Sequence, residues 1–203
     1  VLQIRDHLAA GGAAYVYRIE VAPVEPKLTM TLPERVAFTD IVIPVPKGNR
    51  MAAMAGARRE DFGGEVAVET HGLPPGMTPE VYPIADGLGD APMLFTAAAD
   101  AAAAGALVDL VGRHQKDSLA LEGHLEQRTS LIRGQNNVEV WNQYTNRMAV
   151  AVTDAVPFKV DIVEPKVPLV RSGEMQLKVV ATREGDFKAP INLRMLYNPP
   201  GVS

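Results

Sequence analysis

The four histidines are the side chains of this chain best suited to bind a metal ion or to transfer a proton. They are His7, His71, His114 and His124, and no two of them stand at the close spacing of a metal site such as HExxH. His71 precedes a Gly-Leu-Pro-Pro turn, and His114 and His124 flank an expected strand. We therefore expect surface or capping roles for these side chains, and we predict no bound metal and no cofactor.

The serines and glycine-rich turns give no sign of a nucleophile or a phosphate site. None of the four serines lies in the Gly-x-Ser-x-Gly turn that presents a nucleophile in hydrolases. The glycine-rich turn at residues 87–90 is not followed by the lysine and helix of a phosphate-binding loop. The sequence therefore predicts that the chain is not an enzyme, and it leaves open only a Ser-His-Asp arrangement assembled from distant segments.

Carboxylates gather on two expected loops. Asp86 and Asp90 bracket the glycine-rich turn, and the pair at 60–61 recurs as Glu184 and Asp186. Calcium takes roughly six to eight oxygen ligands, which loop carboxylates can supply. The spacing differs from that of an EF-hand, so a solvated loop is the simpler interpretation and calcium binding is the alternative.

Trp141 is the single tryptophan and the best candidate for a binding residue. Strand alternation over 137–144 places it on a polar face with Glu139 and Gln143, because side chains two apart share a face. An exposed indole offers an apolar body that can stack on a sugar. The candidate sugar-binding surface is therefore Trp141, Asn142 and Tyr144. The alternative is that Trp141 covers residues 1–23 or a neighbouring module, because large aromatic side chains are mostly buried.

Composition narrows the class of protein. The chain has 203 residues, 17 glycines, 16 prolines, a net charge of -4 and no cysteine. Glycine and proline at this level favour many turns and short strands. The basic residues are dispersed, so we expect no nucleic-acid partner, and no apolar run is long enough to predict a membrane span. The lack of cysteine excludes disulfide staples and thiolate metal sites.

A sequence repeat gives the strongest indication of architecture. Residues 58–66 lead into a Pro-Pro-Gly segment at 72–78, and residues 183–191 lead into another at 197–203, with no gap between the two alignments. A Val-Glu-Pro-Lys sequence at 24–27 also returns at 163–166. We interpret these repeats as a duplicated structural unit. In Pro-Pro-Gly, the prolines fix φ and the glycine permits a positive φ, as a turn requires.

The order of turn signals and alternating segments predicts an all-β fold in three parts. Residues 1–25 are expected to contain a hairpin, residues 26–155 a sandwich, and residues 156–203 part of a second, related unit. Residues 96–105 fit a short helix or a loop equally well. Pro44 and Pro46 place their strand at a sheet edge. The strands expected in the middle part are 28–32, 40–45, 50–58, 65–70, 80–84, 93–96, 106–111, 119–125, 137–144 and 147–152.

Several segments resemble modules of large secreted bacterial proteins. Residues 11–21 resemble the closing strand of pre-peptidase C-terminal (PPC) β-sandwich domains, in particular the planctomycete-type versions. Residues 61–77 and 95–112 resemble the Ig-like modules that often follow such domains, and residues 149–158 resemble the junction to a next module. The resemblance implies a terminal PPC-like hairpin at 1–25, an Ig-like β-sandwich at 26–155 and an incomplete tandem copy at 156–203. It also implies an extracytoplasmic location, and it carries over no catalytic residue.

These observations lead to one expected function and two alternatives. We expect a non-catalytic structural or interaction module of a larger secreted or cell-surface bacterial protein. One alternative is a carbohydrate-binding module, and the other is an accessory domain of a secreted peptidase. The expected partners are neighbouring domains of the same protein, a glycan or a surface protein. Exposed strand edges of the incomplete unit would also permit a homodimer.

Overall fold

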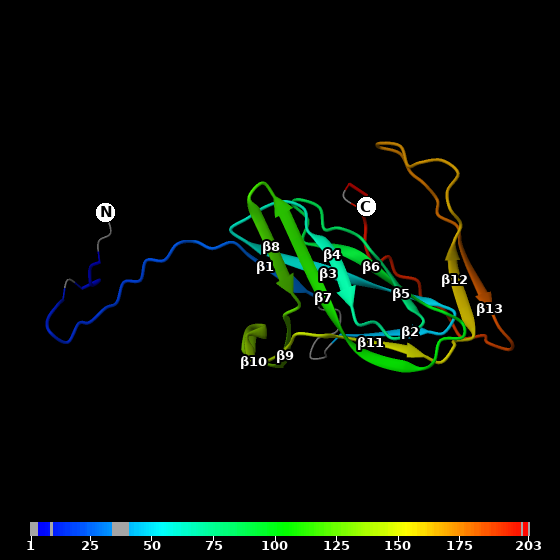
Figure 1. The fold of residues 1–203 in the computed structure, drawn as a ribbon, viewed down its shortest axis with the longest axis horizontal. Helices are drawn as coiled ribbons and strands as arrows, with labels where there is room; N and C mark the ends of the chain where they lie inside the picture. The colour runs from blue at the N-terminus through cyan, green and yellow to red at the C-terminus, as the bar shows by residue number, and fades with distance from the viewer. Residues whose placement is uncertain (1–3, 9, 34–40, 200, 203) are drawn as a thin grey trace.

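The computed structural model describes residues 4–8, 10–33, 41–199 and 201–202. Within these ranges the chain forms thirteen strands, one short 3-10 turn at Gln135–Asn137 and no α-helix, so the all-β prediction is confirmed. No helix in the described ranges is long and apolar enough to cross a membrane. Figure 1 shows one strand-rich body between an extended N-terminal segment and a separate two-stranded sheet.

Two sheets form the central body, and the first is antiparallel whereas the second is mixed. The first sheet has the order β1-β3-β6-β5, and the second has the order β2-β11-β7-β4 with β8 also paired to β7. The strands of the first sheet are β1 (Lys27–Thr31), β3 (Arg50–Glu60), β5 (Met77–Val81) and β6 (Asp90–Ala97). Those of the second are β2 (Val42–Pro46), β4 (Ala67–His71), β7 (Ala104–Lys116), β8 (Leu119–His124) and β11 (Met148–Thr153).

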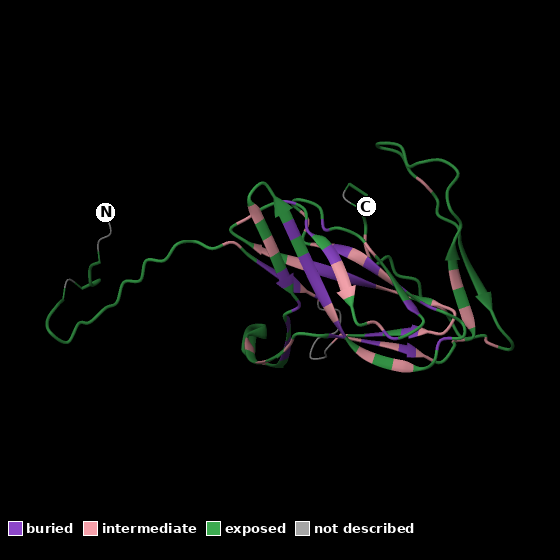
Figure 2. Cartoon of the chain, in the orientation of Figure 1, coloured by how far each residue is buried: buried purple, intermediate pink, exposed green. Residues whose placement is uncertain are grey.

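The core lies between these two sheets. Met30 and Phe95 of the first sheet and Ile43, Leu110 and Val150 of the second belong to one buried cluster. Figure 2 shows that burial is concentrated in this body. Burying each large apolar side chain contributes about 1.5–3 kcal/mol, so this cluster holds the sheets together as a sandwich. The alternating burial of Val42–Pro46 and Met148–Thr153 is the pattern expected of strands with one face on a core.

Several predicted strands agree with the observed ones, and three features differ. The proline-containing strand β2 pairs only with β11 among the described strands, so its edge position is confirmed. Residues 98–103 form a turn between β6 and β7, which makes the loop alternative correct and the helix alternative wrong. Strand β9 (Gln127–Arg133) was not predicted, because its polar sequence hides the alternation. Ile191, Leu193 and Met195 alternate in the sequence as in a strand, but they lie in no strand of the structure.

The hairpin predicted for residues 1–23 is not present in the described part of that segment. Residues 4–8 and 10–26 contain turns and extended chain but no strand, and every described residue before Pro26 is exposed. A two-stranded hairpin is marginal in water unless a third strand or another element packs against it. Nothing packs against this segment in Figure 1, so alternation alone did not produce a hairpin.

The second unit consists of one two-stranded sheet without a core. Strands β12 (Phe158–Ile162) and β13 (Val179–Arg183) pair antiparallel, with Phe158 opposite Arg183 and Ile162 opposite Val179. No described residue after Thr153 is buried. Phe187 stacks on Phe158 with ring centroids 5.4 Å apart, which gives the sheet one local apolar contact. The unit therefore forms paired strands but no sandwich of its own.

The two Pro-Pro-Gly segments share a closing hydrogen bond and the conformation of their glycine. Met77 N donates to Pro74 O at 3.2 Å, and Val202 N donates to Pro199 O at 3.0 Å. Gly76 has φ 79° and Gly201 has φ 83°, the left-handed conformation that glycine adopts without a steric penalty. Their surroundings differ, because Gly76 lies against Ala101 whereas Gly201 faces open space.

The loops that precede these turns are also related, with a one-residue insertion. Arg59, in β3, donates from Nε to Gly64 O at 2.9 Å, and Arg183, in β13, donates from Nη1 to Ala189 O at 2.6 Å. Two residues after each arginine, Asp61 and Gly185 have φ of 59° and 55°. The structure therefore equates Arg59, and not Arg58, with Arg183, so the gapless alignment of the two loops was wrong.

The Val-Glu-Pro-Lys repeat has no structural counterpart. Val24 precedes β1, whereas Val163 follows β12. Leu28 of β1 lies opposite Arg59, and Phe158 of β12 lies opposite Arg183, so β12 corresponds to β1. The second copy of this sequence consequently lies at the other end of the equivalent strand, and its match to residues 24–27 is not a structural equivalence.

Candidate binding surface

A twisted hairpin beside the sandwich carries the sequence-predicted binding residues. It consists of β9, the 3-10 turn Gln135–Asn137 and β10 (Glu139–Thr145), which pair only with each other among the described strands. Asn136 and Asn137 have φ of 56° and 61°, and asparagine tolerates this left-handed conformation better than most residues. Gly134 N donates to Val138 O at 2.8 Å and closes the loop.

Two bulges shift the alternation of this hairpin. Glu139 lies opposite Arg133 and Trp141 opposite Ile132, which leaves Val140 without a cross-strand partner. Asn142 lies opposite Ser130, so Leu131 of β9 likewise has no cross-strand partner. A bulge inserts one residue, bends the strand and increases its twist. The strong curl of β9 and β10 in Figure 1 agrees with two such insertions.

Trp141 and Tyr144 are three residues apart on β10 and lie on opposite faces, and the bulge at Val140 moves Glu139 to the face of Tyr144. Arg128 is the cross-strand partner of Tyr144 and forms an ion pair with Glu139, so Glu139 and Tyr144 share a face. Residues five apart share a face only where one residue has been inserted between them. Asn142 belongs to this polar face, and Trp141 to the other. The prediction that Trp141 shares a face with Glu139 was wrong because sequence alternation does not reveal a bulge.

Exposed apolar side chains surround Trp141 at the two bulges. Trp141 is 64% exposed, and its cross-strand partner Ile132 and the two bulge residues Val140 and Leu131 are exposed as well. We call these four residues the apolar platform. Trp141 covers neither residues 4–26 nor a buried surface, so the indole is free to contact a partner. A cluster of exposed large apolar side chains is typical of an interaction surface.

The face that carries Tyr144 borders a polar hollow. Tyr144 is 58% exposed and lines a depression of about 230 Å³ together with Arg58, Glu126 and Arg128. Arg58 forms ion pairs with Glu60 and Glu126, at 3.2 and 3.7 Å. The charges of the hollow are thus already paired, because Arg58 contacts Glu126 and Arg128 contacts Glu139. Its aromatic ring and its mixed polar lining suit a small polar ligand better than an apolar one.

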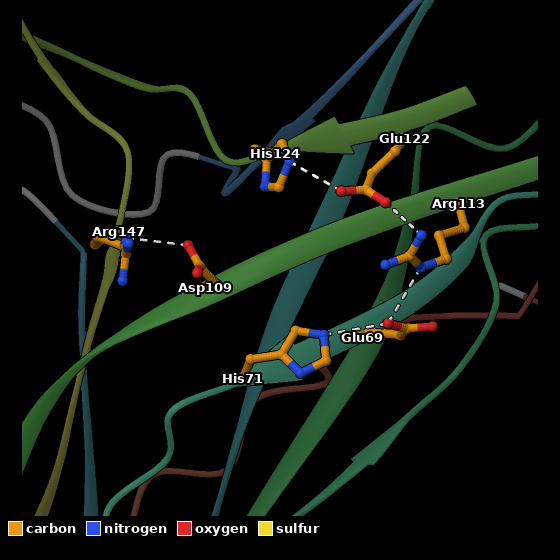
Figure 3. A network of polar contacts seen from close by, with 7 residues as sticks. All are labelled: Glu69, His71, Asp109, Arg113, Glu122, His124 and Arg147. Carbon is orange, nitrogen blue, oxygen red and sulfur yellow. Dashed lines mark hydrogen bonds and ion pairs between the residues drawn. The ribbon is translucent and has the colours of Figure 1, made fainter.

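A charged ladder crosses the outer face of the second sheet (Figure 3). Arg113 of β7 binds Glu69 of β4, with Nε 3.3 Å from Oε2, and forms an ion pair with Glu122 of β8. His71 Nε2 lies 3.1 Å from Glu69, and His124 Nε2 lies 3.2 Å from Glu122. These exposed pairs contribute little to stability individually, but together they keep this face polar.

The Arg113 guanidinium sets the titration of Glu69. Its hydrogen bond, with a smaller contribution from His71, holds the pKa of Glu69 below the ordinary value. Because the folded pKa is lowered, the stability that this carboxylate contributes is present above the ordinary pKa of glutamate. It is lost as the pH falls through the lowered value. Glu69 in turn is the main cause of the raised pKa of Arg113.

We expect the substitution Arg113→Met to raise the pKa of Glu69 toward its ordinary value, because the strongest donor to the carboxylate is removed. A pH titration of the glutamate side-chain carbons by NMR measures this shift. Arg50→Met is the matched control, because Arg50 pairs with Asp161 on another part of the molecule. An unchanged Glu69 pKa in the Arg113→Met variant would contradict this assignment of cause.

Three of the four histidines and Asp86, considered above as candidate ligands, contact other groups of the protein. His71 and His124 are exposed as expected, but His114 is 3% exposed, so the surface role expected for it was wrong. His114 Nδ1 lies 2.8 Å from Glu65 O, and its ring centroid is 4.9 Å from that of Phe62. Asp86 Oδ1 accepts a hydrogen bond from Gly64 N at 2.8 Å. Among the described residues, no three histidine or carboxylate side chains are placed to hold a metal ion.

Comparison of the chain with protein-family models, curated proteins and solved structures finds no significant match.

Proposed function

We propose that this chain is a non-catalytic structural or interaction module of a larger secreted or cell-surface bacterial protein. The observation that carries the proposal is the second occurrence of one local unit: strand, arginine-bound loop and Pro-Pro-Gly turn. The first copy belongs to a sandwich with a buried core, and the second lies on a sheet without one. A complete and an incomplete copy in series are typical of a tandem array of modules.

The sandwich and its flanking segments are expected to differ strongly in protease resistance. Cleavage requires backbone that is exposed or that opens easily, and the segments on either side of the sandwich bury no described side chain. Limited proteolysis followed by mass spectrometry should yield a resistant fragment close to residues 26–155. Equal resistance of residues 156–203 would show that the chain is one cooperative unit, and that would contradict the modular proposal.

Glycan binding is the second candidate function, and the exposure of both Trp141 and Tyr144 favours it. Because these rings lie on opposite faces, Trp141→Ala and Tyr144→Ala separate the two surfaces. Saturable binding on a glycan array that is lost in one variant would assign a sugar-binding role to that face. Tyr82→Ala removes an exposed ring elsewhere and serves as the control. A purely structural module is expected to show no saturable binding.

A further inference from the structure

The segment 15–21 is extended and has the pattern of a strand without a strand partner. Tyr17 and Ile19 alternate with Arg18 and Glu20, and all four are exposed. Arg18 and Glu20 form an ion pair of 3.2 Å, which places the two charges on one face. The two apolar side chains consequently lie on the other face. An amphipathic extended segment of this kind is suited to add to a free sheet edge.

Strand β12 offers such an edge. Val163 N donates to Lys178 O, and Glu184 N donates to Pro157 O, so the odd-numbered residues of β12 direct their backbone groups toward β13. By alternation, Val160 and Ile162 direct their N–H and C=O groups to the opposite edge. Phe158 O already accepts a hydrogen bond from Asn49 Nδ2 at 3.0 Å, so a new strand can pair along 159–162.

The charges of the two segments define one register. In the antiparallel alignment that sets Ile19 opposite Val160, Arg18 lies opposite Asp161 and Glu20 opposite Lys159. Opposite charges across a strand pair are stabilising, and like charges are destabilising. Antiparallel slips of two residues set Arg18 opposite Lys159, or Glu20 opposite Asp161. A parallel alignment that sets Arg18 opposite Lys159 makes both pairs repulsive.

The apolar side chains agree with the same register. Tyr17 then lies opposite Ile162, and Ile19 opposite Val160, on the face that also carries Val179 of β13. Ile162 and Val179 are exposed in the single chain. A third strand would cover part of this apolar face and satisfy the free backbone groups of β12. Asp161, which now pairs with Arg50 at 3.1 Å, has a second carboxylate oxygen for Arg18.

The two segments lie at opposite ends of the molecule. In Figure 1 the N-terminal segment extends away from one end of the sandwich, and β12 and β13 stand at the other end. A pairing between them therefore joins two copies head to tail. Such a contact uses different surfaces on each copy, so it joins successive copies into a ring or an open chain.

We propose that residues 17–20 of one copy pair antiparallel with Lys159–Ile162 of a second copy, with Arg18 opposite Asp161 and Glu20 opposite Lys159. The partner is thus another molecule of this chain. The inference goes beyond the proposed function and does not depend on any ligand of the β9–β10 hairpin, because it uses only the two ends of the molecule.

Charge reversal tests the pairing in the full chain. Sedimentation velocity at increasing concentration and low salt should show association beyond the dimer. Arg18→Asp or Asp161→Arg alone should weaken it at least tenfold, because each sets like charges opposite each other. A mixture of the two variant chains should associate again, because every junction between them restores an opposite pair. Arg171→Asp is the control for Arg18→Asp. It makes the same charge change outside both paired segments and should leave association unchanged.

Disulfide trapping checks the register. The natural chain has no cysteine, so Ile19→Cys combined with Val160→Cys introduces the only thiols. Oxidation should give a ladder of covalent oligomers, whereas Ile19→Cys combined with Asp161→Cys, one residue out of register, should give at least tenfold less. A wild-type chain that stays monomeric throughout overturns the proposal, as does association that the mixed variants fail to restore.

Discussion

Replacing Arg59 by methionine is expected to lower the free energy of unfolding by about 3 kcal/mol, because a charged donor shared by several carbonyls is lost. Its guanidinium donates to Leu88 O at 2.7 Å, to Ile84 O at 3.0 Å, to Ala85 O at 3.2 Å and to Gly64 O at 2.9 Å. Ile84 O keeps the Val66 amide as a donor and Ala85 O keeps the Leu88 amide, whereas Leu88 O and Gly64 O keep no other described donor. The variant therefore releases the 84–88 loop from the end of β3.

The neighbouring arginine provides the control. Arg58 is half exposed and forms ion pairs with Glu60 and Glu126, so Arg58→Met should cost less than about 1 kcal/mol. Urea unfolding followed by circular dichroism measures both variants, with the slope of the transition as a check that the unfolded state is unchanged. Equal losses in the two variants would show that the carbonyl-binding role of Arg59 has little energetic weight.

The second large effect is expected at a pair of glycines that face each other across β7 and β8. Gly112 lies opposite Gly123, and β1 packs directly over both. A Cβ at position 123 would lie 2.4 Å from Leu28 O and 2.7 Å from Leu28 C. These are backbone atoms of a strand already paired with β3, so they cannot move aside without disturbing that pairing. We expect Gly123→Ala to destabilise the sandwich by about 3 kcal/mol, the upper part of the range for overpacking.

Gly89→Ala is the matched control, because a Cβ there meets no atom within 4 Å and the backbone does not have a positive φ. Its unfolding free energy should stay within about 1 kcal/mol of the wild type. Thermal and urea unfolding of the two variants can be compared directly. A Gly123→Ala chain as stable as Gly89→Ala would mean that β1 does not pack against β8 as closely as these distances indicate.

Local signals in the sequence were sufficient where local chemistry determines the structure. The Pro-Pro-Gly turns form as predicted, because proline restricts φ and glycine permits the left-handed residue in any surroundings. Pro44 and Pro46 placed β2 at an edge for an equally local reason, the missing amide hydrogen. The positions of most sandwich strands followed from period-two alternation interrupted by turn residues.

Alternation was insufficient where a strand needs a partner or contains an insertion. Residues 15–21 alternate well, yet they form no strand in the single chain because no edge lies beside them. β9 forms despite a polar sequence because β10 supplies its hydrogen bonds. In the candidate surface, Trp141 and Tyr144 were identified as exposed aromatic residues. Their spacing of three residues already places the two rings on opposite faces, whereas the bulge at Val140, which moves Glu139 away from the face of Trp141, is visible only in the register of the pair.

The sequence by itself determined the all-β class, the turns and the repeat of a short unit, because these depend on φ preferences and on side-chain alternation along the chain. Tertiary structure alone decided which arginine of 58–59 binds the loop carbonyls, that His114 is buried, and that β1 lies on paired glycines. Each of these depends on atoms brought together from distant segments. These features depend on how closely distant segments pack against one another, and no local sequence pattern encodes that packing.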